Sequence, residues 1–445
     1  MPLFGTDGIR GVAGVDLTAE LAQRAGSAFG QFLKRRGDHA SAVVIGKDPR
    51  LSSDMLEQAL ASGLSSVGAQ CFTCGILPTP AISYLVQANG LSGGAMISAS
   101  HNPVRDNGIK FISASGEKFT EAEEGEIERL YEDGMATQTS SSGSPRPLAG
   151  ARQSYLEFLL GRYPGPSVPA NCVVALDCAF GATAQLAVEV FQRIGTRAIA
   201  IGDEHDGSRI NVNCGATHTN PLAALVRGNR AFCGFAFDGD GDRAMTVDET
   251  GAVLDGDNAI ASFVKRRYSK RDGISKVAVG TSYSNEGLSE AIAHCGFTLV
   301  RARTGDRYVY EDLKRTGAVI GGEPSGHLIF MDLARTGDGI LSALLLFALA
   351  LGEGSPFSAL AQDMRHYPQV LLNLALMPAQ RSSFGTNLQA QEAIRLAAQL
   401  VEGRGRVFVR ASGTEPLLRI LVEADDRTLA ESTAQNLLTS LQSLL

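Results

Sequence analysis

The sequence predicts three similar α/β domains with mixed sheets and a smaller C-terminal α+β domain, arranged around a central cleft. Three observations lead to this prediction. A chain of 445 residues is too long for a single hydrophobic core. One pattern occurs three times: an apolar β-rich run, a Gly- or Ser-bearing loop, a helical segment and further strands. After about His366 the pattern changes.

The first strand of each repeat is a continuous apolar run: 42-AVVIGKD-48, 172-CVVALDC-178 and 276-KVAVGTS-282. Such strands are typical of parallel sheets that helices cover on both faces. A later strand of each repeat leads into a polar, Gly-rich loop: 94-GAMISASHNP-103, 234-GFAFDGDGDR-243 and 318-AVIGGEPSGH-327. Because ligands bind beyond the carboxyl ends of strands in open α/β sheets, we expect these three loops to share one cleft.

We place the four domains at residues 1–148, 149–250, 251–365 and 366–445. The Ser-rich run 136–148 is predicted to be a surface connection, and helices are expected at 151–163 and 257–268. In the last domain we expect a strand, a helix over 388–403, two strands flanking 410-RASGTEP-416, and a closing helix.

Composition restricts the classes of function. An apolar fraction of 44% and a charged fraction of 20% are typical of a soluble globular protein, and no apolar run is long enough to span a bilayer. The start lacks the features of a signal peptide, so a cytoplasmic location is expected. A net charge of −7 argues against nucleic-acid binding, and an anionic substrate would need a locally basic pocket. The seven scattered cysteines are interpreted as buried free thiols.

The run 238-DGDGDR-243 places Asp238, Asp240 and Asp242 at alternate positions, with glycines that let the backbone curl. Carboxylates that face one point suit Mg²⁺, and they repel one another unless a cation neutralises them. The alternatives are an Asp/Gly surface turn and a calcium helix-loop-helix site ending at Glu249. The calcium site is disfavoured because Arg243 stands where Gly is required and a strand precedes the loop. We therefore predict a Mg²⁺ site with positions open to phosphate oxygens.

A second loop, 410-RASGTEPLLR-419, is rich in donors suited to a phosphate dianion. The donors are the Arg410 guanidinium, the Ser412 and Thr414 hydroxyls, and the backbone N–H groups around Gly413. An ordinary hairpin with a Gly turn is the alternative.

The segment 321-GGEPSGH-327 sets Glu323, Ser325 and His327 at alternate positions, where all three can bond sugar hydroxyls. The alternative is a common turn with a structural histidine. Arg10 in 5-GTDGIRG-11 and Arg307 in 304-TGDRYV-309 add positive charge on polar loops.

The stretch 98-SASHNPVRDNGIK-110 sets Ser100 beside His101. A hydrolase serine usually lies in a G-x-S-x-G turn, whereas Ser100 is flanked by Ala99 and His101. Adjacent residues on an extended loop tend to point apart, so His101 is expected to be a poor base for its neighbour. A serine that faces a metal and a phosphate pocket is better interpreted as a phosphoryl carrier.

The chain resembles the α-D-phosphohexomutase superfamily nearly from end to end. The motifs FGTDGIRG, ISASHNP with DNGIKF, DGDGDR, TGDRYV, GGEPSGH with TGDGI, and RASGTEPLLR occur in the family's order at similar spacing. The GTDGIRG start and the SGTEP loop are similar to the branch that acts on glucosamine phosphates. Pro324 stands where that branch usually has Gln, and because Pro fixes φ the sugar loop is expected to differ there.

The resemblance implies that Ser100 is a phosphoserine that holds one Mg²⁺ together with Asp238, Asp240 and Asp242. It implies that proton transfer falls to Lys110 first and His327 second, near Arg10, and we add His101 to this catalytic group. The resemblance implies that Arg243 lies beside the metal and that the substrate contacts are Glu323, Ser325, Arg410, Ser412, Gly413 and Thr414. We add Arg243, Arg307 and Arg419 to the substrate contacts, with a surface residue as the alternative for Arg419.

The resemblance further implies that glucosamine 6-phosphate and glucosamine 1-phosphate are interconverted through glucosamine 1,6-bisphosphate, on the route to UDP-N-acetylglucosamine. The expected partner is a small-molecule sugar phosphate, with no nucleic acid and no membrane, and the expected state is a monomer or homodimer. One alternative is a phosphomannomutase or phosphoglucomutase of the same superfamily. A non-catalytic sugar-phosphate sensor is disfavoured because a binder needs neither the carrier serine nor the three aspartates.

Overall fold

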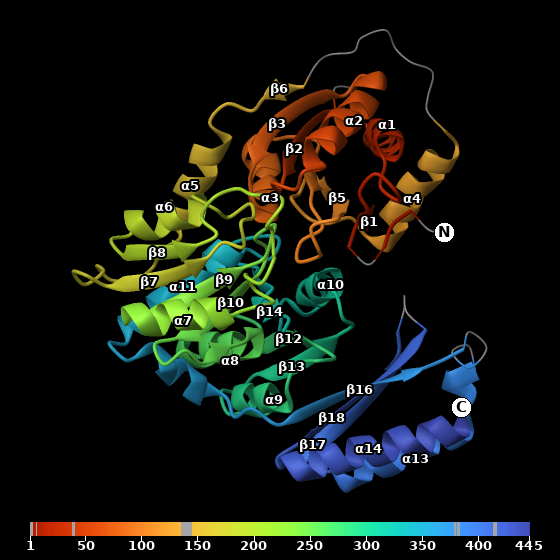
Figure 1. Ribbon diagram of the computed structural model, residues 1–445, viewed down its shortest axis with the longest axis vertical. Coiled ribbons are helices and arrows are strands. Elements are labelled where there is room, and N and C mark those ends of the chain that lie inside the picture. The colour runs from red at the N-terminus through yellow and green to blue at the C-terminus, as the bar shows by residue number, and fades with distance from the viewer. Residues whose placement is uncertain are drawn as a thin grey trace.

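The computed structural model describes residues 3–5, 7–37, 41–134, 145–377, 380, 383–412 and 416–445. It contains four domains, each built on its own sheet, and the fourth lies to one side of the other three (Figure 1). The predicted fold class is confirmed.

The first sheet has six strands: β1 (Ile9–Val12), β2 (Ala42–Lys47), β3 (Gln70–Ile76), β4 (Gly93–Ile97), β5 (Asp106–Ser113) and β6 (Arg146–Pro147). Their order is β1-β5-β4-β2-β3-β6, and β5 is antiparallel to both of its neighbours. The helices are α1 (Ala19–Arg35), α2 (Ser53–Ser66), α3 (Thr79–Ala88) and α4 (Glu121–Glu132). Helices α1 and α2 pack closely because Gly26 and Gly63 lack the Cβ that would overlap the facing backbone.

The second sheet has five strands: β7 (Val173–Asp177), β8 (Arg197–Ile201), β9 (Cys233–Phe237), β10 (Ala244–Asp248) and β11 (Val253–Leu254). Their order is β11-β10-β9-β7-β8, so the sheet extends past residue 250, where we placed a domain boundary. The helices are α5 (Ala151–Gly161), α6 (Leu186–Arg193) and α7 (Asn220–Asn229).

The third sheet has four strands: β12 (Val277–Thr281), β13 (Thr298–Ala302), β14 (Ile320–Gly322) and β15 (Leu328–Phe330). Their order is β13-β12-β14-β15. The α-helices are α8 (Gly256–Arg266), α9 (Glu286–Ala293), α10 (Asp306–Thr316) and α11 (Gly339–Gly352), and the 3-10 helices are η1 (Tyr268–Lys270) and η2 (Phe357–Asp363).

The predicted repeat is confirmed, because four strands have the same arrangement in each of the three sheets. In each, the first apolar strand lies between a parallel neighbour and a two-stranded antiparallel hairpin. The hairpins are β4–β5, β9–β10 and β14–β15, and their loops carry Ser100, the three aspartates and the segment Glu323–His327. The three polar loops therefore occupy equivalent positions.

The fourth domain contains an antiparallel sheet of β16 (Gln369–Ala375), β17 (Gly405–Ala411) and β18 (Leu417–Ala424). Helices α13 (Leu388–Leu400) and α14 (Arg427–Leu444) lie against this sheet, and a 3-10 helix, η3 (Phe384–Thr386), precedes α13. Its buried apolar side chains form a core of their own. In contrast, one continuous core runs through the first three domains.

Helix α11 lies at the centre of that continuous core and packs on β9, β10 and α8. It is apolar on all sides, the pattern of a helix buried all round. In the part of the chain that the structure describes, no single helix is long and apolar enough to cross a membrane. Helix α11 passes that test only together with η2, from which it is bent by 97°.

The N-terminus of α11 carries a buried carboxylate whose charge should lower stability at neutral pH. Asp338 accepts the Leu341 N–H at 3.0 Å and the Tyr155 hydroxyl at 2.7 Å, and burial raises the pKa of Asp338 to about 6. The pKa of Asp338 is higher in the folded than in the unfolded protein. The contribution of protonated Asp338 to the free energy of unfolding is therefore present below about pH 4 and is lost as pH rises through 6. Asp338→Asn keeps the helix cap and removes the charge.

We therefore expect Asp338→Asn to gain on the order of 2 kcal/mol over the wild type between pH 4 and pH 8. Urea unfolding of both proteins at several pH values measures this difference. A difference in unfolding free energy that stays constant with pH would contradict the prediction.

Candidate active site

A cleft of about 710 Å³ opens where the polar loops of the first three domains meet. The first domain contributes Arg10 and His101, the second Arg243 and the third Glu323. No described residue of the fourth domain lines this cleft. The expectation that the three equivalent loops share one cleft is confirmed.

The three aspartates of the β9–β10 loop form a buried cluster. Asp238, Asp240 and Asp242 are at most 3% exposed, and one carboxylate oxygen of each lies within 4.8 Å of the others. Burial, followed by the charges of Asp242 and Asp240, raises the pKa of Asp238 well above its usual range. Within the described residues, Asp240 Oδ1 and Asp242 Oδ1 are buried and accept no hydrogen bond. These oxygens fit a hard divalent cation such as Mg²⁺.

Ser100 points from the β4–β5 loop at this cluster. Its Oγ donates to Asp238 Oδ2 at 2.6 Å, and the residue is 1% exposed. Its φ of 53° lies in the left-handed region, which side chains with a Cβ rarely adopt. The hydroxyl therefore faces the aspartates of another domain.

The expectation that Ser100 and His101 point apart is wrong. The Ser100 Oγ lies 3.1 Å from His101 Nδ1, because left-handed backbone at Ser100 breaks the alternation of an extended loop. Burial, aided by the charges of Arg243 and Arg10, lowers the pKa of His101 to about 4. His101 is thus neutral at neutral pH. Because the Ser100 hydroxyl donates its one proton to Asp238, the tautomer of His101 protonated at Nδ1 would donate to Ser100 Oγ.

Lys110, on β5, lies among carboxylates of two domains. Its Nζ is 2.8 Å from Asp240 Oδ2, 3.1 Å from Asp7 Oδ2 and 3.6 Å from Asp242 Oδ2. Burial opposes the charged form, but Asp240, Asp7 and Asp242 raise the pKa of Lys110 well above its usual value. As an ammonium group, Lys110 can donate a proton to a leaving oxygen.

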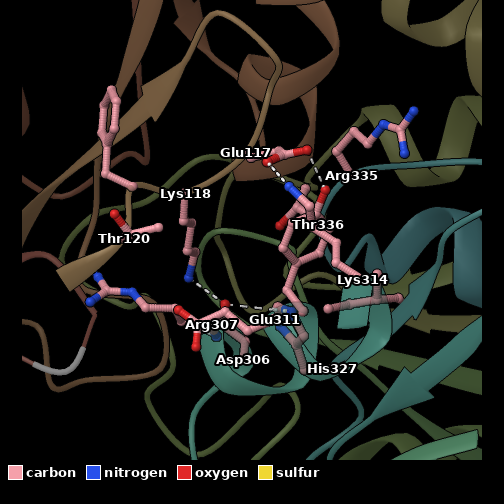
Figure 2. Close-up of a pocket in the computed structure, with 13 residues that line it drawn as sticks. Glu117, Lys118, Thr120, Asp306, Arg307, Glu311, Lys314, His327, Arg335 and Thr336 are labelled. Atoms are coloured by element: carbon pink, nitrogen blue, oxygen red, sulfur yellow. Dashed lines mark hydrogen bonds and ion pairs between the residues drawn. The ribbon is translucent and has the colours of Figure 1, made fainter. Parts of the chain in front are cut away.

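A chain of alternating charges continues from Lys110 through Asp7, Lys118 and Asp306 to His327. Lys118 Nζ donates to Asp7 Oδ1 at 2.5 Å and also pairs with Asp306. His327 lies between two carboxylates, with Nε2 3.5 Å from Asp306 Oδ2 and Nδ1 3.6 Å from Asp242 Oδ1. Figure 2 shows Lys118, Asp306 and His327 in a pocket of about 230 Å³, which shares Asp306 with the cleft.

This chain of charges joins the first and third domains, and its two ends contact aspartates of the second. Three of its members were not predicted from the sequence: Asp7, Lys118 and Asp306. Asp7 and Asp306 lie inside the motifs GTDGIRG and TGDRYV, in which only the arginines were predicted to be functional. Lys118 follows the segment 113-SASGE-117 and lies in none of the motifs described above.

The two cleft arginines are both held by acidic groups. Arg10 donates to Asp7 Oδ2 at 2.5 Å and to Asn102 Oδ1 at 3.2 Å. Arg243 Nε lies 3.7 Å from Asp242 Oδ1, and its backbone N–H donates to Asp238 Oδ1 at 3.2 Å. They supply the basic pocket that an anionic substrate requires in an acidic protein.

The β14–β15 loop brings Glu323, Pro324 and Ser325 to the cleft. Glu323 Oε1 accepts the Gly305 N–H at 3.1 Å, and the buried Ser325 Oγ has no hydrogen-bond partner among the described residues. A free hydroxyl beside a held carboxylate can bond a polyhydroxylated ligand.

Arg307 lines the smaller pocket of Figure 2 and not the larger cleft. It is buried on α10, where its guanidinium pairs with Glu124 of the first domain, and it is not among the described residues that line the cleft. Figure 2 shows this guanidinium directed away from His327. The structure thus gives Arg307 a contact between domains.

The predicted phosphate loop belongs to the fourth domain, at the end of the β17–β18 hairpin. Arg410 and Arg419 stand directly opposite each other on these strands, and Ser412 is 3% exposed. The two arginine side chains therefore lie on one face of the sheet, next to the predicted phosphate loop. Gly413 and Thr414 lie outside the described residues.

The chain matches four domain models of one family in order. The phosphoglucomutase/phosphomannomutase alpha/beta/alpha domains I, II and III match residues 1–138, 153–251 and 255–367. The C-terminal domain of the same family matches residues 372–440.

Relatives of similar length carry one name. A phosphoglucosamine mutase of Thermoanaerobacter pseudethanolicus is 41% identical over 438 residues, which cover 98% of this chain and 97% of that relative. A phosphoglucosamine mutase of Desulforudis audaxviator is 42% identical over 441 residues, covering 98% and 96%.

Solved structures share the fold. A phosphoglucomutase/phosphomannomutase family protein of Burkholderia thailandensis has a TM-score of 0.84 at 23% identity, covering 99% of this chain and 97% of its own. An N-acetylphosphoglucosamine mutase of Aspergillus fumigatus, in complex with GlcNAc-6P and magnesium, has a TM-score of 0.70 at 17% identity, covering 99% and 96%.

Proposed function

Because this chain belongs to the phosphoglucomutase/phosphomannomutase family, we propose that it is a mutase that interconverts glucosamine 6-phosphate and glucosamine 1-phosphate. Full-length relatives about 41% identical to it carry the name of that activity. The observation that carries the proposal is the buried Ser100 hydroxyl, which lies 2.6 Å from Asp238 Oδ2 of the aspartate cluster. That arrangement suits a serine that carries a phosphoryl group.

In the proposed reaction the free hydroxyl of the sugar phosphate attacks the phosphorus of phosphorylated Ser100. The bond from phosphorus to Ser100 Oγ breaks, and the products are the serine and glucosamine 1,6-bisphosphate. The bisphosphate turns over in the cleft, Ser100 Oγ attacks its other phosphate, and the isomeric monophosphate leaves. The two transfers balance, so the net change is an isomerisation.

We assign proton transfer to Lys110 first and His327 second. In each transfer the Lys110 ammonium protonates the oxygen from which phosphorus departs, and the proton released by the attacking hydroxyl restores that ammonium group. Arg10 and Arg243 offset the charge of the transferring group, while Glu323 and Ser325 hold sugar hydroxyls. One Mg²⁺, held by phosphorylated Ser100, Asp238, Asp240 and Asp242, would stabilise negative charge on the transferring phosphoryl group.

The remaining assignments are also proposals. Arg410, Ser412, Gly413, Thr414 and Arg419 would hold the non-reacting phosphate, as donors of this type suit a dianion. The four domains would end near residues 148, 254, 365 and 445. The enzyme would act in the cytoplasm as a monomer or homodimer, in amino-sugar supply for cell-wall precursors.

The amino-sugar assignment predicts a substrate preference. At equal concentration, phosphorylated protein with Mg²⁺ is expected to convert glucosamine 6-phosphate at least about tenfold faster than glucose 6-phosphate or mannose 6-phosphate. A tenfold ratio corresponds to about 1.4 kcal/mol in transition-state binding. The three initial rates measure it.

A preference for glucose or mannose would contradict the amino-sugar assignment and leave the mutase chemistry in place. Pro324 would then be the first residue to test, because it lines the cleft where the glucosamine branch usually has Gln. Pro324→Gln should move the preference back toward the amino sugar.

A further inference from the structure

Arg50 is a fully buried arginine behind the loop that carries Ser100. It lies between β2 and α2, in the segment 46-GKDPRLSS-53, and its side chain is 0% exposed. It is not among the described residues that line the cleft. Burying a guanidinium group costs free energy unless its N–H donors have hydrogen-bond acceptors. The acceptors of Arg50 therefore indicate its structural role.

All five N–H donors of Arg50 are used. Nε donates to an aspartate of its own loop, and the other four donors reach carbonyl oxygens of the Ser100 loop. The acceptors are Asp48 Oδ2 at 2.9 Å and the carbonyl oxygens of Pro103 at 2.6 Å, Asp106 at 2.9 Å, Ser100 at 2.9 Å and Asn102 at 2.9 Å. Four carbonyl dipoles thus converge on one cation.

Asp48 extends this support to the strand side of the loop. Its Oδ2 accepts the Ser98 hydroxyl at 2.6 Å, and the Ser98 Oγ in turn accepts the Ser100 N–H at 2.8 Å. The backbone of Ser100 is therefore held at its N–H through Ser98 and at its carbonyl oxygen through Arg50.

The second domain holds the same carbonyl group. Asn211 Nδ2 donates to the Ser100 carbonyl oxygen at 2.9 Å. Gly207 of the same domain approaches so closely that an added Cβ would overlap the backbone of Pro49 and Arg50. The second domain thus contacts both the Ser100 loop and the segment that carries Arg50.

We propose that Arg50 is the positioning residue of the phosphoryl carrier. The left-handed backbone of Ser100 is costly for a residue with a Cβ and persists only where surrounding contacts impose it. Arg50 imposes it through the Ser100, Asn102, Pro103 and Asp106 carbonyls, which directs the Ser100 Oγ at Asp238. This inference rests on the proposed function, since it requires Ser100 to carry the phosphoryl group.

Arg50→Lys tests the proposal. Lysine has three donors, so at least two of the five acceptors lose their partner. The single-turnover transfer of phosphate from Ser100 to glucosamine 6-phosphate should slow by on the order of 10²-fold, while KM changes by less than about threefold. Arg105→Lys is the matched control: it lies in the same loop with its side chain 78% exposed, and it should transfer at the wild-type rate.

Asn211→Gly provides a second variant that leaves Arg50 intact. The φ of Asn211 is 60°, which glycine adopts freely, so the substitution removes the amide donor without adding strain. We expect the same transfer step to slow by about tenfold. Because both side chains hold the Ser100 carbonyl, the effects of Arg50→Lys and Asn211→Gly should not add.

The proposal is overturned if both variants transfer at the wild-type rate, or if their loss appears only as a higher KM or a lower melting temperature. Failure of the proposed function gives another result. In that case the Ser100→Ala variant would convert glucosamine 6-phosphate at the same rate as the wild type. No phosphate would be found on Ser100 of the wild-type protein.

Discussion

Ser100→Ala is expected to lower turnover by at least about 10³-fold, a loss of about 4 kcal/mol in transition-state stabilisation. The variant lacks the oxygen that would carry the phosphoryl group between the two positions of the sugar. The substitution is well matched, because Ala and Ser have the same Cβ at the φ of 53°. The rate of glucosamine 6-phosphate conversion measures the loss, and intact-protein mass spectrometry detects phosphate on Ser100 of the wild type.

Ser115→Ala is the control for this variant. Ser115 is exposed in the turn after β5, where its Oγ contacts Ser113 Oγ at 2.9 Å. It should keep turnover within about twofold of the wild type. Folded Ser100→Ala protein with near-normal turnover would disprove the carrier role, whereas retained binding of the sugar phosphate is expected, because the cleft keeps its arginines and its sugar loop.

Removal of divalent metal is expected to have an effect of similar size. A chelator should lower turnover by on the order of 10³-fold, since a bound metal contributes several kcal/mol of charge stabilisation in phosphoryl transfer. Added Mg²⁺ should restore the rate. The structural reason is the pair of buried oxygens, Asp240 Oδ1 and Asp242 Oδ1, which lack a hydrogen-bond donor among the described residues.

Asp242→Asn tests the same site without a chelator. It should weaken Mg²⁺ binding and reduce the rise in melting temperature that Mg²⁺ produces in the wild type. Calorimetric titration with Mg²⁺ and thermal unfolding with and without the metal provide readouts independent of turnover. Asp203→Asn, at an exposed position of the same domain, is the control. Equal Mg²⁺ affinity in Asp242→Asn and the wild type would refute the metal site.

Local patterns predicted the repeated framework well. Continuous apolar runs became β2, β7 and β12, because strands buried on both faces leave that signature. The aspartate cluster was predictable for a related reason. Asp238, Asp240 and Asp242 lie at alternate positions of one short loop, so their proximity depends mainly on the local sequence.

The prediction that needed a backbone conformation failed, and the rotation of a helix decided which pocket Arg307 lines. The left-handed φ of Ser100 is imposed by Arg50 and Asn211, which lie far from it in sequence, so no local rule gave the contact with His101. Asp306 and Arg307 are neighbours on α10, but successive residues of a helix point about 100° apart. The first reaches the cleft and the second contacts Glu124.

The sequence by itself determined the three α/β repeats, the loops that face the cleft and the side chains with which each loop can act. Only the tertiary structure decided which charges meet. Lys118 and Asp306 are 188 residues apart and come together because the first and third domains pack against each other. Strand period and loop composition are local properties of the chain, whereas the partners of a buried charge depend on how whole domains dock.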